Sequence, residues 1–503
     1  MFVNIFKHIS FARLTLSNQL FQVSTVALLT FGLLLVSCKD EPPAEVPEEE
    51  EALRPNILFI MVDDMGVGDL SSYGQEAFST PHIDRLSKEG MRFTQAYAGC
   101  TVCAPSRSTL MTGQHTGHTP VRGNTGGIPL PNEAFTLAEL LKEAGYVTGG
   151  FGKWGLGDIG TEGVPEKQGF DTFYGYYHQI HAHDHYPEYL IRNGEKEMLP
   201  GNAGFYANQK KAGPKPSAKE GLQHQFAPYL IAEEMKAWIR SHKDEAFFCY
   251  APWTPPHAKY EIPETDSAWI AVKDEKWPLE AKIHAAFTML IDRQVGEILD
   301  LLDELKLTSN TLFVFTSDNG AAQRFEGTLN SSGAYSGFKR SMYEGGLKVP
   351  FLMKWPEYIP AYSESGLPIY FPDMMPTFAE LAGVSDLVPD STDGISFVPT
   401  LLEGVQPISH QFMYWEWPLY DWNKGEYTGE FLQAVRHGKW KALRSSEQEP
   451  WKLYDLDLDY TESIDQAEKN PGVLEEIEFW VLTTRDKMAE QKEPEMPKGK
   501  KFR

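Results

Sequence analysis

The chain has 503 residues, more than one compact core needs, which predicts one large domain accompanied by a smaller one. Hydrophobic residues make up 42% and aromatic residues 13%, so the composition excludes a disordered chain. The formal net charge of −24 excludes a nucleic-acid-binding protein, because phosphate contacts need a basic surface. The same charge repels anions, so a site for a polyanionic ligand must bring its own cations or a metal ion.

Residues 1–37 are predicted to be a secretory signal peptide. Lys7 and Arg13 precede an apolar run over residues 23–36, which ends in Leu-Val-Ser directly before Cys38. This ending resembles a bacterial lipobox, which implies that Cys38 is lipidated and becomes the mature N-terminus. The alternative is an uncleaved transmembrane helix, for which the apolar run is short.

Residues 38–53 are rich in Pro and Glu, cannot bury a core, and are predicted to form an acidic flexible tether. An acidic stretch just after a lipidated cysteine also resembles the surface-export signal of Bacteroidetes lipoproteins. We therefore expect an exported lipoprotein that contacts the membrane only through its lipid anchor. Its expected place is the outer membrane, facing the cell surface, and the periplasm is the alternative.

Apolar runs along the next part of the chain predict buried parallel strands that end in polar residues. Between them lie helical patterns over residues 136–145 and 283–305, and strands alternating with helices indicate an α/β fold with a mainly parallel, doubly wound sheet. Ligands of such sheets bind at the carboxyl ends of the strands. The runs are residues 55–62, 311–317 and 246–251, followed by Asp63-Asp64, by Asp318-Asn319, and by a proline-rich turn that ends at His257.

Beyond residue 408 the pattern changes to short alternating segments, which predict an antiparallel meander followed by a helix over residues 473–488. We therefore predict a catalytic domain over residues 54–408 and a smaller C-terminal antiparallel-sheet subdomain over residues 409–489. The charged residues 490–503 are predicted to be a frayed tail.

Cys100 and Cys103 form a Cys-x-x-Cys pair of the kind found in redox and metal sites, but no second pair and no thioredoxin-like pattern accompany it. Cys103-Ala-Pro-Ser-Arg107 instead resembles the signature of type I sulfatases, which belong to the alkaline phosphatase superfamily. The resemblance extends from about residue 54 to residue 488. It implies an alkaline-phosphatase-like fold and a formylglycine made from Cys103 by a formylglycine-generating enzyme or an anaerobic maturase.

The ends of two predicted strands supply a candidate metal site. Carboxylate and amide oxygens suit a hard cation, Ca²⁺ or Mg²⁺, better than zinc. An Asp-Asp or an Asp-Asn pair after a strand, taken alone, is more often a solvated turn. The resemblance to type I sulfatases favours one Ca²⁺ per chain, which the formylglycine at position 103 would also contact. The predicted protein ligands are Asp63, Asp64, Asp318 and Asn319.

Three cations are expected around a bound sulfate. The leaving oxygen of a sulfate ester gains negative charge as the bond breaks, and fixed positive groups stabilise that transition state. Arg107 lies four residues after Cys103, on the same side of a helix that begins there. Lys153 in Gly-Lys-Trp-Gly-Leu-Gly and Lys339 upstream of Glu-Gly-Gly match the family's lysines, which implies catalytic and substrate-binding roles. Outside such motifs, most lysines are exposed surface charges.

His257 matches the family histidine that protonates the departing alcohol, although a histidine after a proline-rich turn is also a common surface residue. Its pKa near neutrality suits it to this role. The resemblance thus implies that a hydroxyl of hydrated formylglycine, held by Ca²⁺ and Arg107, attacks sulfur in line while His257 protonates the sugar oxygen.

One position departs from the family pattern. Many sulfatases have Gly-Lys-Trp-His-Leu-Gly, whereas here Gly155 stands in place of the histidine that contacts the formylglycine. The same variant resembles a subset of bacterial carbohydrate sulfatases. The residue that replaces this histidine is left open, with His115 and His118 as candidates.

The segment over residues 175–187 is rich in histidine and tyrosine, which is typical of a metal site or of a sugar-binding loop. It is similar to a loop of exo-acting sulfatases on galactose or N-acetylgalactosamine 4-sulfate, which implies that His183 contacts the sugar. Trp415 and Trp417 are further candidates for stacking on sugar rings, although tryptophan is more often buried. The implied substrates are oligomers of carrageenan, ulvan or glycosaminoglycans.

Two other functions remain open from the sequence. A phosphodiesterase or phosphonate monoester hydrolase of the same superfamily can share the nucleophile and the metal ligands. A glycan-binding lipoprotein without catalytic activity is the other alternative, and the presence of Cys103, Lys153, Lys339 and His257 argues against it.

Overall fold

The computed structural model describes residues 53–204, 213–215, 218–219 and 222–488. The predicted signal peptide, the lipidation site Cys38, all but the last residue of the tether and the tail over residues 490–503 lie outside these residues. The described residues belong to one compact unit. Within the described ranges, none of the helices combines the length and the apolar character that crossing a membrane requires.

A ten-stranded sheet forms the centre of this unit, with the order β15-β2-β14-β13-β1-β11-β4-β5-β6-β7. The middle strands, from β13 to β5, all run parallel, and β14, β2, β6 and β7 add antiparallel pairings at the edges. The parallel strands are β13 (Thr311–Ser317), β1 (Asn56–Asp63), β11 (Phe247–Pro256), β4 (Val147–Lys153) and β5 (Thr172–Tyr176). The edge strands are β15 (Ser363–Ser365), β2 (Met91–Phe93), β14 (Phe351–Lys354), β6 (Tyr189–Arg192) and β7 (Glu195–Met198).

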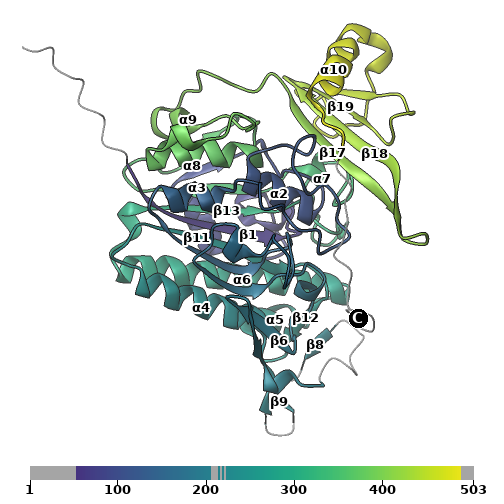
Figure 1. Cartoon of the computed structure of the whole chain (residues 1–503). Coiled ribbons are helices and arrows are strands. Elements are labelled where there is room, and N and C mark those ends of the chain that lie inside the picture. Colours follow the sequence, from purple (N-terminus) through teal and green to yellow (C-terminus); the bar gives the residue numbers. More distant parts are fainter. Residues whose placement is uncertain (1–52, 205–212, 216–217, 220–221, 489–503) are drawn as a thin grey trace, which may run out of the picture. The chain divides into compact units, whose positions relative to one another are not determined.

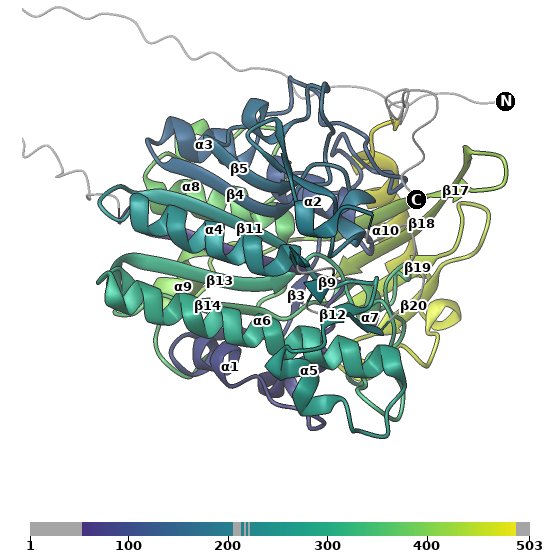
Figure 2. The ribbon, with the colours of Figure 1, turned by 90° about the horizontal axis from the view of Figure 1, so that it is seen from below.

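Helices cover both faces of the sheet (Figures 1 and 2). Because successive strand residues point to opposite faces, β1 alternates between two apolar cores: Phe59 packs into one and Ile60 into the other. The first face carries α2 (Cys103–Thr112), α3 (Leu137–Glu143), α8 (Met374–Ala382) and α9 (Val398–Glu403). The second carries α1 (Pro81–Lys88), α4 (Ala227–Ser241) and α6 (Leu279–Glu304). The predicted α/β fold with a mainly parallel sheet is confirmed.

Smaller elements border the strand ends. They comprise the pairs β3 (Ala96–Tyr97) with β16 (Ile369–Tyr370), β8 (Gly213–Lys215) with β12 (Glu261–Pro263), and β9 (Ala218–Lys219) with β10 (Leu222–Gln223), together with the helices α5 (Ser267–Val272) and α7 (Glu344–Leu347). Helix α7 contains the Glu-Gly-Gly motif that follows Lys339.

The C-terminal part is a four-stranded antiparallel sheet, as predicted. It consists of β17 (Met413–Asp421), β18 (Glu426–His437), β19 (Trp440–Arg444) and β20 (Lys452–Asp455), followed by α10 (Pro471–Thr484). Helix α10 ends four residues before the predicted end at residue 488.

Buried charges join this sheet to the rest of the unit. Lys441 on β19 is fully buried and lies 2.8 Å from Glu344 on α7 and 2.9 Å from Glu462. Trp415 is also fully buried, and its indole N–H donates to the carbonyl of Ala98 at 2.9 Å. Trp415 is therefore a core residue and not a sugar platform, and Trp417 packs partly buried against the same core.

Candidate active site

The candidate site lies where four neighbouring parallel strands end. In the sheet order β13-β1-β11-β4, each strand delivers a predicted functional residue at its carboxyl end. The parallel register places these ends at one edge of the sheet, so residues up to about 255 positions apart in sequence meet there. The residues are Asp318 and Asn319 after β13, Asp63 and Asp64 at the end of β1, His257 after β11, and Lys153 at the end of β4.

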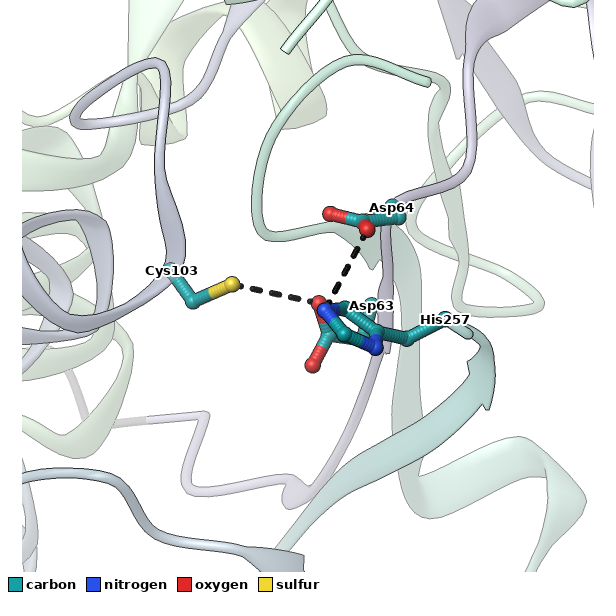
Figure 3. A group of neighbouring side chains, drawn as sticks. All are labelled: Asp63, Asp64, Cys103 and His257. Carbon is teal, nitrogen blue, oxygen red and sulfur yellow. Dashed lines mark hydrogen bonds and ion pairs between the residues drawn. The ribbon is translucent and has the colours of Figure 1, made fainter. Parts of the chain in front are cut away.

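Cys103 reaches this edge of the sheet from a helix and not from a strand, because it is the first residue of α2. The helix begins after Val102 in extended conformation and ends at Gly113, whose φ of 67° is the left-handed conformation that glycine adopts readily. The thiol of Cys103 lies 3.3 Å from a carboxylate oxygen of Asp63 (Figure 3) and 3.1 Å from the ammonium of Lys339. The thiol of Cys100 instead faces the carbonyl of Glu416 at 3.8 Å, so the Cys-x-x-Cys pair does not act as a unit.

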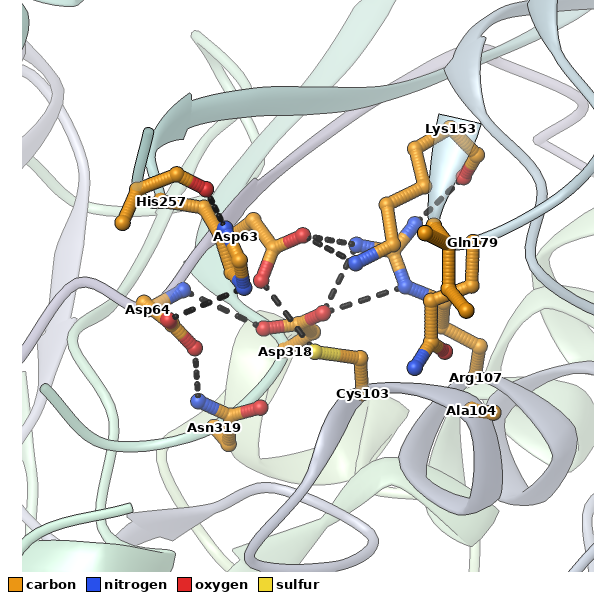
Figure 4. Close-up of polar contacts among 12 residues, drawn as sticks. Asp63, Asp64, Cys103, Ala104, Arg107, Lys153, Gln179, His257, Asp318 and Asn319 are labelled. Carbon is orange, nitrogen blue, oxygen red and sulfur yellow. Dashed lines mark hydrogen bonds and ion pairs between the residues drawn. The ribbon is translucent and has the colours of Figure 1, made fainter. Parts of the chain in front are cut away.

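The three carboxylates pair with the three predicted cations, and Figure 4 shows the contacts of Asp318 with Arg107 and of Asp63 with Lys153 and Arg107. The guanidinium of Arg107 donates to Asp318 at 2.7 and 3.0 Å, which confirms that it turns back over the start of α2. The ammonium of Lys153 lies 2.5 Å from Asp63. That of Lys339 contacts Asp64. These side chains are at most 6% exposed, so the charges interact with little screening by water.

The oxygen donors of the two strand ends fit a hard divalent cation. Carboxylate oxygens of Asp63 and Asp64 converge with Cys103 and His257 within 4.8 Å of one another. The Asp64 backbone N–H donates to Asp318 at 3.3 Å, and the Asn319 amide N–H₂ donates to Asp64 at 2.7 Å. The amide oxygen of Asn319 is buried without a protein partner. A buried acceptor of this kind beside three carboxylates matches the ligand set of Ca²⁺ or Mg²⁺.

The electrostatics set the protonation of the site. Burial alone would raise the pKa of Asp63, but the charges of Lys153, His257, Lys339 and Arg107 hold it well below its usual value. Burial and the charges of Asp318 and Asp63 raise the pKa of the Cys103 thiol to about 12. An unmodified Cys103 is therefore protonated at neutral pH and is a weak nucleophile.

His257 and His183 lie together beside the carboxylates. The imidazole of His257 is 3.5 Å from Asp64, and its ring stacks on that of His183, with centroids 4.1 Å apart and planes inclined by 18°. Burial lowers the pKa of both imidazoles. The Nε2 atom of His183 is buried and has no protein partner, so it is available to a ligand. The structure thus brings His183, predicted as a substrate contact, next to the predicted proton donor.

His115 and His118 do not reach the site. Both follow the C-terminal end of α2, whereas Cys103 is its first residue, which separates them by about 15 Å along the helix. Their imidazoles stack at 4.4 Å, and His118 hydrogen-bonds to Asp393 at 2.9 Å. Neither histidine replaces the one that is missing at Gly155.

Two residues that the sequence analysis did not single out border the nucleophile. The backbone N–H of Ala104 donates to the side-chain oxygen of Asn124 at 3.0 Å, and the amide of Gln179 donates to the same oxygen at 2.9 Å. Gln179 falls within the histidine- and tyrosine-rich segment that was predicted to bind sugar. Asn124 lies in an irregular loop, and no sequence pattern pointed to it.

Comparison with known proteins gives a consistent result. The family described as Sulfatase matches residues 55–384, and the family of N-sulphoglucosamine sulphohydrolase C-terminal regions matches residues 333–479. The N-acetylgalactosamine-6-O-sulfatase of Bacteroides thetaiotaomicron is 30% identical over 522 residues, which span 88% of this chain and 95% of that protein. Human arylsulfatase A is 33% identical over 413 residues, covering 78% of this chain and 75% of that protein.

Solved structures show the same relationship. The crystal structure of Ps i-CgsB matches with a TM-score of 0.70 and 27% identity, over 85% of this chain and 92% of that one. The phosphonate monoester hydrolase of Agrobacterium radiobacter, with a TM-score of 0.64 and 22% identity over 86% of this chain and 95% of that one, shares the fold. Taken with the convergent residues at the sheet edge, these matches show that the chain belongs to the sulfatase family, as a type I sulfatase of the alkaline phosphatase superfamily that hydrolyses sulfuric esters.

Proposed function

We propose that this sulfatase removes O-linked sulfate from a carbohydrate, with a formylglycine made from Cys103 and one Ca²⁺ held by the strand-end oxygens. The observation that carries the proposal is the setting of Cys103. Its side chain is buried at the start of α2, 3.3 Å from Asp63 and 3.1 Å from the ammonium of Lys339, and it belongs to the cluster whose side chains could hold a metal ion. A nucleophile at this position can therefore contact both the cation and the bound sulfate.

Formylglycine supplies a hydrated aldehyde whose hydroxyl can attack sulfur, and Ca²⁺ supplies positive charge that orients this hydroxyl and the sulfate. The ligands for Ca²⁺ would be Asp63, Asp64, Asp318 and Asn319, with the side chain at position 103. Maturation would require a formylglycine-generating enzyme or an anaerobic maturase from the host.

The chain's own residues do the remaining work. Lys153 and Lys339 are buried beside the nucleophile and compensate negative charge as the sulfur–oxygen bond breaks. Arg107 is fixed by Asp318 and orients the start of α2. His257, next to Asp64, donates a proton to the departing sugar oxygen. The lining of the site is buried, which limits the access of water and strengthens each of these interactions.

For the substrate we propose a sulfated galactose or N-acetylgalactosamine unit at the end of an oligosaccharide, from carrageenan, ulvan or a glycosaminoglycan. His183 would contact the sugar through its Nε2 atom, which has no protein partner, on a ring that stacks on that of His257. A relative named N-acetylgalactosamine-6-O-sulfatase and a solved structure of Ps i-CgsB with neocarrahexaose support sugars of this class.

The test combines mass spectrometry with a substrate panel. Protein co-expressed with a formylglycine-generating enzyme is digested, and the peptide containing position 103 is examined for the aldehyde. Release of sulfate and phosphate is then measured from sulfated mono- and oligosaccharides and from phosphate mono- and diesters. An unmodified thiol, or faster turnover of the phosphodiesters, would refute the proposal, and Cys103→Ala serves as the inactive control.

The cellular location is proposed from the sequence alone. We propose that Cys38 carries lipid and that the enzyme faces the cell surface from the outer membrane. Metabolic labelling with a fatty acid should mark the wild-type protein and not Cys38→Ala. Protease added to intact cells should digest the wild-type protein, and resistance to it would favour the periplasmic alternative.

A further inference from the structure

The vacant place at Gly155 is faced by the side chain of Gln179. Gly155 has a φ of 83°, and a Cβ atom built on it would lie 3.5 Å from Cδ of Arg107 and 3.8 Å from Oε1 of Gln179. No other atom lies within 4 Å of that position apart from the glycine's own chain neighbours. The loss of the histidine is thus accompanied by a second polar side chain that reaches the same space.

Hydrogen bonding fixes which end of the Gln179 amide faces this space. The backbone N–H of Ala104 can only donate, so the Asn124 atom that it contacts at 3.0 Å is the side-chain oxygen. Gln179 must then present its N–H₂ group to that oxygen, at 2.9 Å. The Oε1 atom of Gln179 therefore points away from Asn124, toward Arg107 and Gly155.

This oxygen is an acceptor without a donor. Gln179 is 4% exposed, and its Oε1 is buried with no protein partner. Figure 4 shows the side chain alongside Arg107, extending toward the first turn of α2, which carries Cys103 and Ala104. A buried amide oxygen left unpaired is costly, and in a functional site it indicates a partner that arrives with the ligand or the modification.

We propose that Oε1 of Gln179 accepts a hydrogen bond from a hydroxyl of the hydrated formylglycine at position 103, in the place of the family's missing histidine. This inference rests on the proposed function. Gln179 is a positioning residue, because an amide takes up no proton near neutral pH. It holds the hydroxyl in orientation, and it favours the hydrate over the free aldehyde because only the hydrate can donate to it.

The first experiment compares wild-type enzyme with Gln179→Met, which keeps the length of the side chain but removes the acceptor. In enzyme produced with ¹³C-labelled cysteine, NMR distinguishes the hydrate carbon of formylglycine from its aldehyde carbon. The ratio of hydrate to aldehyde is expected to fall about 5-fold or more, in line with the loss of one buried hydrogen bond. With turnover normalised to formylglycine content, kcat is expected to fall at least 10-fold while KM changes less than 3-fold.

Gln168 offers a matched control outside the site. It is also a buried glutamine with an unpartnered Oε1, and its N–H₂ group donates to the carbonyl of Glu162 at 3.2 Å. Gln168→Met is expected to leave both kcat and the hydrate ratio unchanged. Gln179→Asn, which retracts the amide by one methylene, is the second variant if Gln179→Met does not fold.

A rescue experiment adds a second measurement, the dependence of kcat on pH, which would not change if Gln179 had only a structural role. In Gly155→His combined with Gln179→Met, an imidazole returns to this position on a strained backbone, because φ is 83° there, and Gly155→His alone measures the cost of that strain. Relative to this single variant, the double variant should keep most of its kcat, with a new dependence on pH between about 6 and 7. An unchanged kcat and an unchanged hydrate ratio in both Gln179→Met and Gln179→Asn would overturn the inference. The proposed function would still stand in that case, provided that the wild type releases sulfate. Absence of formylglycine in the wild type would instead refute the proposed function.

Discussion

The imidazoles of His183 and His257 lie face to face, with centroids 4.1 Å apart, although they come from different strand-end loops. Burial and the charge of His257 lower the pKa of His183, and burial also lowers the pKa of His257. In the proposed mechanism His257 donates a proton to the leaving group, and His183 hydrogen-bonds to the sugar.

We expect His183→Phe to preserve the stacked ring and to remove the Nε2 contact. The KM for a sulfated sugar should rise about 10-fold or more, because a substrate hydroxyl then lacks its partner, while kcat changes less. Initial rates over a range of substrate concentrations test this. An unchanged KM would place the sugar elsewhere.

His257→Gln should lower kcat for sulfated sugars by about 10²- to 10⁴-fold, the usual worth of general acid catalysis. An aryl sulfate with a good leaving group needs little protonation, so its hydrolysis should fall much less. The ratio of the two rates, measured for wild type and variant, reports the role. Equal losses for both substrates would mean that His257 does not protonate the leaving group.

Binding of Ca²⁺ should stabilise the fold, because it compensates the buried carboxylates of Asp63, Asp64 and Asp318. At about 100 times its Kd the ion should add about 2.7 kcal/mol to the free energy of unfolding. Thermal melts of the wild-type enzyme with EGTA and with added Ca²⁺ measure this without reference to activity.

Asp64→Asn should abolish the Ca²⁺ response, whereas Asp69→Asn should keep it. Asp69 is equally buried but hydrogen-bonds to the Gly66 backbone and pairs with His284 outside the cluster. Melts of wild type that do not change with Ca²⁺ would contradict the proposed metal site.

Lys441→Met should destabilise the protein by about 3–5 kcal/mol, because it leaves the buried carboxylate of Glu462 without its cation and leaves Glu344 with only the more distant Lys348 at 3.4 Å. Denaturant unfolding measures the loss. Lys439→Met is the matched control: Lys439 pairs with Asp455 at 2.6 Å, but its side chain is 44% exposed, so the expected loss is at most about 1 kcal/mol. Similar losses for the two variants would show that burial of the Lys441 pairs is unimportant.

The pair of His118 and Asp393 predicts a dependence of stability on pH. Burial lowers the pKa of His118, but the hydrogen bond to Asp393 and its charge outweigh burial and raise it. A raised folded-state pKa gives a contribution that is complete below the unfolded value of about 6.5 and is lost as pH rises through the folded value. His118→Gln should thus cost about 1 kcal/mol more at pH 5.5 than at pH 8.5. The difference should vanish in an Asp393→Asn background, and a pH-independent loss would contradict it.

The sequence by itself determined the strands that form the centre of the sheet and the residues that end them. Continuous apolar runs can be buried only on both faces of a sheet, so the runs before Asp63 and Asp318 indicated parallel strands. Pattern alone mislocated the end of β11, which continues through three prolines to Pro256. Prolines are tolerated there because beyond Tyr250 this strand forms ladder pairs with β1 and none with β4.

Only the tertiary structure decided which polar groups meet. The separation of His115 and His118 from the site follows from the length of α2, since a helix carries its two ends about 1.5 Å further apart with each residue. The approach of Gln179 to Gly155 depends on the loop after β5, the Asn124 loop and the start of α2 arriving at one point. Local sequence patterns show which side chains a segment contains. Long-range packing determines which of these side chains are buried together and must therefore form hydrogen bonds or ion pairs with one another.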